Sequence, residues 1–86
     1  MPIITQLGVA RQTTLMADRC IGAARDAWAL APGPGRDERV RDAKLFREEI
    51  RCWIEFAGRK HWHTVVRHGM AQYERASGAM DLLASA

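Results

Sequence analysis

The densest group of residues that could do chemistry is the segment 59–68, which reads Arg-Lys-His-Trp-His-Thr-Val-Val-Arg-His. It holds all three histidines of the chain together with three cationic side chains. A helix brings two metal ligands together when they are three or four residues apart. The histidines at positions 61, 63 and 68 are instead two, five and seven residues apart. We therefore expect no metal site in this segment, and no cofactor elsewhere in the chain.

The same segment offers positive charge to a polyanion. On a helix that starts near residue 60, one polar face carries the candidate phosphate contacts Lys60, His63, Arg67 and Arg75. Trp62 falls on the opposite, apolar stripe, so no aromatic side chain interleaves with the cations for base stacking. The formal net charge of the whole chain is only +3. A small basic nucleic-acid-associated protein is therefore the alternative function rather than the first.

Nothing in the sequence matches a catalytic motif. There is no Gly-x-Ser-x-Gly elbow, and the run at 32–35, Pro-Gly-Pro-Gly, does not lead into the Gly-Lys-Ser/Thr of a phosphate loop. Cys20 and Cys52 fall on apolar helix faces, which predicts reduced, buried side chains rather than nucleophiles or a disulfide. A chain of 86 residues also has little room for a substrate pocket. We expect a protein that is not an enzyme.

The elements that must position these residues are helices, because the hydrophobic spacing is helical throughout. The proline and glycine residues of the first loop interrupt the pattern, and Gly58 interrupts it less decisively. A chain of this length supports one core, so residues 1–86 form a single domain. The expected helices and loop are residues 5–30, 37–57 and 60–83, with a loop at 31–36. Thr5 and Asp37 are the expected helix caps, and Gly58 is the expected C-terminal glycine.

The predicted fold is all-α: a small antiparallel bundle of two to three long helices. A break between the second and third helices is favoured over one continuous helix. Whether homodimerisation completes the bundle is left open by the sequence. In the first helix, the small residues Cys20, Ala24 and Ala27 share an inward face with Trp28, which predicts close helix packing along that line.

The second helix is unusual because its apolar residues cover about half of its circumference or more, wider than the stripe of an ordinary surface helix. Its remaining strip neutralises itself through pairs spaced i, i+4, which are Asp37–Arg41, Lys44–Glu48 and Arg51–Glu55. A helix of this kind must be buried on two sides. The residues that we expect to contact a protein partner are Phe46, Glu49, Ile50, Trp53 and Phe56, with Glu49 fixing the register.

Together these patterns predict a small non-enzymatic protein-binding module that acts through an apolar helical surface and associates first with a copy of itself. Its role would be that of an adaptor, a regulatory subunit or a stoichiometric inhibitor. The longest apolar stretch, residues 27–32, is far shorter than the ~20 residues of a membrane span. The first residues also lack the pattern of a secretory signal. We therefore expect a cytoplasmic protein that has no membrane partner.

Overall fold

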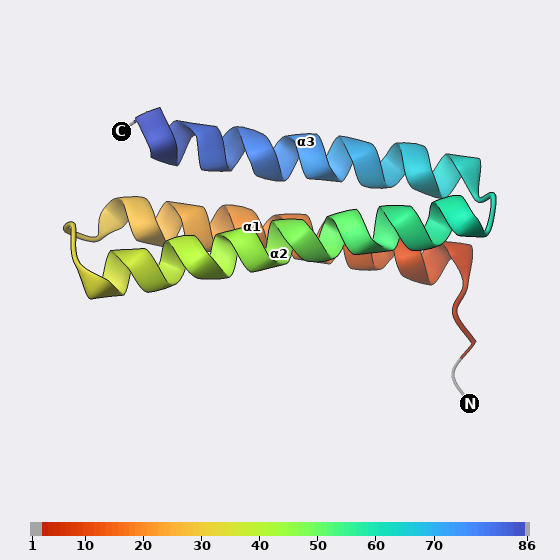
Figure 1. The fold of residues 1–86 in the computed structure, drawn as a ribbon, viewed down its shortest axis with the longest axis horizontal. Coiled ribbons are helices and arrows are strands. Elements are labelled where there is room, and N and C mark those ends of the chain that lie inside the picture. The colour runs from red at the N-terminus through yellow and green to blue at the C-terminus, as the bar shows by residue number, and fades with distance from the viewer. Residues whose placement is uncertain (1–2, 86) are drawn as a thin grey trace.

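The computed structural model describes residues 3–85, and this part of the chain folds into three packed helices without strands. They are α1 (Gln6–Ala29), α2 (Pro34–Arg59) and α3 (His63–Ser85). α2 runs antiparallel to α1, and α3 turns back antiparallel to α2 (Figure 1). Each helix packs against both others, which confirms the small all-α bundle. None of these helices combines the length and the apolar character that crossing a membrane requires.

The two ends of α1 are held by side chains that satisfy its free backbone groups. The hydroxyl of Thr5 accepts a hydrogen bond from the Gly8 N–H at 3.0 Å, which confirms the predicted N-cap. At the other end, the carbonyl of Ala27 accepts hydrogen bonds from the Leu30 N–H and from Nε of Arg36. Arg36 belongs to α2, so this bond ties the start of α2 to the end of α1 and places a cation at the negative end of the α1 dipole.

The start of α2 lies three residues before the predicted cap at Asp37. Pro34 occupies the first helical turn, where the missing N–H of proline leaves no hydrogen bond unmade. Gly33 precedes it with a φ of 154°, a backbone conformation that favours glycine. Asp37 instead lies in the first turn, where its charge faces the positive end of the helix dipole. The prediction of Asp37 as the cap was wrong, and the loop is shorter than the predicted 31–36.

The end of α2 also differs from the prediction, because the helix continues through Gly58. Its C-terminus is closed by hydrogen bonds from the His61 N–H to the Gly58 carbonyl and from the Trp62 N–H to the Ala57 carbonyl. This pair of bonds is a Schellman motif. His61 occupies its left-handed position, with a φ of 59°, where glycine is usual. The turn separates α2 from α3, so the predicted break between them is confirmed.

The core is thin and consists mainly of small side chains. Seven of the thirteen buried hydrophobic residues that the structure describes are alanines, so the helices approach one another closely. Cys20, Ala24 and Ala27 are among the buried residues, as predicted for the inward line of α1. Two clusters make up this core. The larger one is centred on Met16, Cys20, Ile50 and Met80, and the smaller one near the α2–α3 turn is centred on Val9, Ala57 and Val65.

The solvent-facing strip of α2 carries ion pairs. Arg51 binds both Glu48 and Glu55, so the predicted Arg51–Glu55 pair is confirmed, whereas Glu48 pairs with Arg51 rather than with Lys44. The hydrogen bond from Arg51 lowers the pKa of the Glu48 carboxyl. All of these groups are exposed to water, where each pair contributes little to stability.

Candidate functional site

The α2 residues that the sequence assigned to a protein interface lie mostly against the neighbouring helices. Ile50 is 0% exposed and belongs to the larger core cluster, against which Phe46 also packs. Trp53 and Phe56 pack against the smaller cluster, and Glu49 is the only one of the five that is exposed. The wide apolar sector is used within the chain because α2 contacts both α1 and α3. Ile50 therefore offers no surface to a partner, and its assignment to an intermolecular contact is not met in this bundle.

The three tryptophans lie at the edge of the core or outside it. Trp53 and Trp62 are half-buried and flank Phe56 edge to face, with ring centroids 5.7 and 5.8 Å from that of Phe56. Trp28 is 58% exposed, so its predicted place on the inward face of α1 was wrong. An exposed tryptophan is unusual for a soluble monomer, since this side chain is highly buried on average.

Trp28 forms one rim of an apolar groove between α1 and α3, close to the α1–α2 loop. The groove has a volume of about 280 Å³. Its lining residues are Ile21, Ala24, Arg25 and Trp28 of α1 and Ala79, Leu82 and Leu83 of α3. Arg25 is the only charged residue among them. We call this surface the Trp28 groove.

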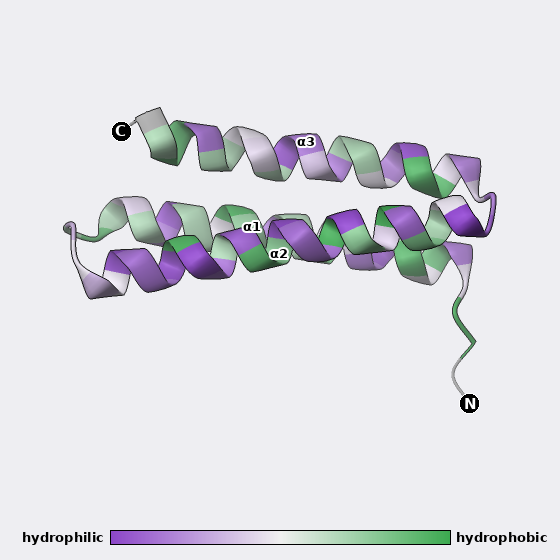
Figure 2. Cartoon of the chain, in the orientation of Figure 1, coloured by the Kyte–Doolittle hydropathy of each residue, from purple (hydrophilic) through white to green (hydrophobic). Residues whose placement is uncertain are grey.

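The groove follows from where small and large residues stand on the two helices. Ala24 is buried and Ala79 half-buried, and because neither side chain extends beyond Cβ, the floor between α1 and α3 stays hollow. Trp28 and Leu82 stand at the rims, and Leu82 is 66% exposed. Hydrophobic residues occur in the last turns of α3 (Figure 2), and Leu82 is the exposed large one among those described there. Small residues at the floor with large ones at the rims form a hole suited to an inserted apolar side chain.

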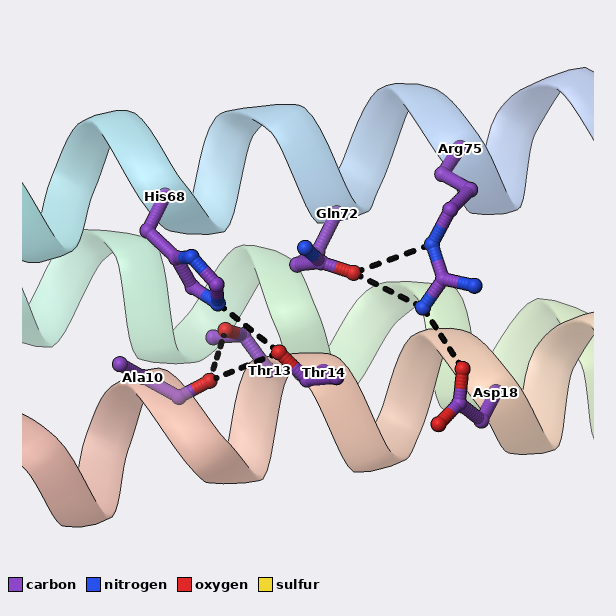
Figure 3. A network of polar contacts seen from close by, with 7 residues as sticks. All are labelled: Ala10, Thr13, Thr14, Asp18, His68, Gln72 and Arg75. Carbon is purple, nitrogen blue, oxygen red and sulfur yellow. Dashed lines mark hydrogen bonds and ion pairs between the residues drawn. The ribbon is translucent and has the colours of Figure 1, made fainter.

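Beyond the groove, toward the α2–α3 turn, polar side chains also join α1 to α3. Arg75 donates from Nη2 to a carboxylate oxygen of Asp18 at 2.7 Å, and it also binds the side-chain oxygen of Gln72 (Figure 3). One turn away along α1, Nε2 of His68 and the hydroxyl of Thr14 share a hydrogen bond of 2.8 Å. These bonds link α1 and α3 beside the groove.

The four residues of the nucleic-acid alternative do not form one surface. Lys60, His63 and Arg67 are exposed around the α2–α3 turn, and Lys60 lies over the Phe56 ring with its Nζ 5.7 Å from the centroid. Arg75 points instead toward α1, where Asp18 compensates its charge. The structure therefore brings three of the four residues to one end of the bundle and holds the fourth elsewhere.

The thiols and histidines do not assemble a reactive centre in the described part of the chain. Cys20 is 0% exposed, and burial raises the pKa of its thiol, which disfavours the nucleophilic thiolate. Cys52 is exposed, contrary to the prediction that both cysteines are buried. The rings of His61 and His63 are 6.4 Å apart. Among the described residues, no group of three or more histidine, cysteine or acidic side chains is placed to hold a metal ion.

The arrangement of the Trp28 groove suits noncovalent binding. Its lining is apolar apart from Arg25, and the neighbouring Asp18 and Arg75 are bound to each other. A surface of this kind can bury an apolar side chain of another molecule. No protein-family model matches this chain, and comparisons with curated proteins and with solved structures find no match either.

Proposed function

We propose that this protein is a small non-enzymatic module that binds another protein chain, and that the Trp28 groove is its docking surface. The observation that carries the proposal is the exposure of Trp28 and Leu82 on the two rims of one apolar groove. Aromatic side chains of this kind are the usual anchors of protein interfaces. The roles of adaptor, regulatory subunit or stoichiometric inhibitor all require such a surface and no catalytic group.

The exposed part of Trp28 is large enough to anchor an interface. A fully buried aromatic side chain covers roughly 150–250 Å², so the 58% of Trp28 that is exposed corresponds to about 100 Å². At ~25 cal/mol per Å², covering this area contributes about 2–3 kcal/mol. This value lies in the range of a binding hot spot.

A photo-crosslinking experiment tests the docking surface. p-Benzoylphenylalanine placed at position 28 should form covalent adducts with a protein after irradiation in the native host. Position 45 provides the matched control, since Leu45 is 68% exposed but lies on α2, away from the groove. Adducts from position 28 that position 45 does not give would support the proposal. Equal yields, or no adducts from position 28, would overturn it.

The alternative proposal is a nucleic-acid-associated role for the α2–α3 turn. It is favoured by the placement of Lys60, His63 and Arg67 together at one exposed end, where the two basic side chains form no ion pair within the described residues. Replacing all three with glutamine should abolish retention on DNA or RNA at low salt. Arg75→Gln should leave retention unchanged, because Asp18 compensates that charge. Lack of retention of the unmodified protein at low salt would remove this alternative.

A further inference from the structure

The chain exposes more surface than a monomer of its mass usually does. Its accessible surface is 5830 Å², whereas a folded monomer of 9.7 kDa exposes about 5,100 Å². The difference of about 700 Å² is close to the ~800 Å² that each partner contributes to a standard interface. The shape agrees with this excess, since the radius of gyration of 14.0 Å exceeds the ~12 Å of a compact domain of this length. The elongated shape of the three-helix bundle thus leaves more surface accessible to a partner than a compact domain of the same mass would.

The formal charge is distributed unevenly along the bundle. The half near the α2–α3 turn, residues 3–17 and 47–73, carries six cationic and three acidic side chains. The half near the α1–α2 loop, residues 18–46 and 74–85, carries seven of each. The whole net charge of +3 therefore lies in the turn half, and the loop half, which contains the Trp28 groove, is neutral.

This distribution selects one way of joining two copies. Contact through the loop halves brings two neutral surfaces together and leaves the two positive turn halves pointing apart. Contact through the turn halves would bring like charges together, which is unfavourable. Of the two ends of the bundle, the end with the apolar groove is thus also the end whose residues carry no net charge, and Arg25 is the one charged side chain that lines the groove.

We infer that the partner of the Trp28 groove is a second copy of this chain, so that the protein is a homodimer with its two grooves face to face. This inference rests on the proposed function of the groove. In a two-fold dimer each residue of the contact is used twice. Trp28 and Leu82 of one copy then cover the hollow floor that Ala24 and Ala79 leave in the other, as knobs cover holes.

Sedimentation equilibrium at micromolar concentration tests the dimer, with two leucine variants as a matched pair. The unmodified protein should have twice the mass of the 9.7 kDa chain. Leu82→Gln should raise the dissociation constant by about 10- to 100-fold, since the lost contact occurs twice in a symmetric dimer. Leu45→Gln should leave the constant within about twofold, because Leu45 is equally exposed but lies outside the groove. Circular dichroism of both variants should match the unmodified protein, since both leucines are exposed.

Three results would overturn the inference. The first is a monomer for the unmodified protein, and the second is a dimer on which Leu82→Gln and Leu45→Gln act equally. The third comes from crosslinking at position 28. Adducts of twice the chain mass support the homodimer, whereas adducts with other proteins alone overturn the homodimer and leave the proposed docking function intact. The absence of any adduct overturns both.

Discussion

Gly69 lies where α3 packs closely against α2 and α1. Adding a single carbon atom at this position tests that packing. Gly69 is a buried residue of α3, and a Cβ at this position would lie 2.7 Å from Cγ1 of Ile54 on α2 and 3.7 Å from Cγ2 of Thr13 on α1. Cβ atoms essentially never approach another heavy atom to less than 3.0 Å. Gly69→Ala therefore requires Ile54 or the α3 backbone to move. The atom in contact is a branch of the Ile54 side chain rather than its flexible end.

The expected change in the free energy of unfolding follows from two opposing effects. Replacing glycine by alanine inside a helix stabilises the folded state by about 0.5–1 kcal/mol. Overpacking of a core costs about 1–3 kcal/mol. Gly78 lies on the same helix, and a Cβ there would meet no atom within 4 Å. Gly78→Ala therefore receives only the favourable effect, and the difference between the two variants, about 1–3 kcal/mol, is the steric cost at Gly69.

Urea unfolding followed by far-UV circular dichroism measures this difference at a fixed protein concentration, since association would add a concentration-dependent contribution. The free energy of unfolding should decrease from Gly78→Ala to the unmodified protein to Gly69→Ala. Combining Gly69→Ala with Ile54→Ala should recover about 0.5–3 kcal/mol relative to additivity, because the clashing atoms are gone. If Gly69→Ala were as stable as Gly78→Ala, the close approach of α3 to α2 would be refuted.

Three further predictions concern the two thiols and the α2–α3 turn. Burial raises the pKa of the Cys20 thiol, so the thiol ionises more readily in the unfolded chain than in the folded one. The stability that the buried neutral thiol contributes is therefore complete below the ordinary thiol pKa of 9.0 and is lost as the pH rises above that value. The free energy of unfolding, measured with urea, should therefore decrease more steeply above pH 9.0 for the unmodified protein than for Cys20→Ala. Equal decreases with pH in the two proteins would contradict the burial of Cys20. At neutral pH a thiol reagent should label Cys52 at once and Cys20 only as the chain opens. His61 has a positive φ, which glycine adopts without strain and alanine does not. His61→Gly should therefore raise the free energy of unfolding by about 1 kcal/mol, whereas His61→Ala should not. Equal effects of the two substitutions would contradict the Schellman turn.

The helices were predictable from the sequence because their signals are local. The helical spacing, the Thr5 cap and the proline and glycine loop depend on residues close together in the chain. The ends of α2 were harder to predict, because several residues near each end are of types that can begin or end a helix. Asp37 can cap a helix, but Pro34 can begin one earlier; Gly58 can end a helix, but His61 takes the left-handed position instead. These choices depend on where the chain must turn to bring the next helix into contact.

The candidate site was less predictable, because the width of an apolar face does not tell which neighbour covers it. The broad sector of α2 is covered by α1 and α3 within the chain. The contacts beside the groove, Asp18 with Arg75 and Thr14 with His68, join residues 57 and 54 positions apart. No local spacing indicates such pairs. Trp28 stands at the border of the α1 face, and only the position of α3 decides that its ring lies outside the core.

The small residues of the core and the exposure of Trp28 have a common physical cause. Alanine and cysteine at the inward positions of α1 let α2 and α3 approach closely, and the contact of Gly69 with Ile54 shows the same closeness between α3 and α2. Helices this close leave no space between them for an indole ring. A large side chain at the border of the inward face is therefore displaced to the rim, where it is exposed to water. The packing that stabilises the single chain thus also produces its apolar groove, which is why we propose the groove, and not the buried face of α2, as the docking surface.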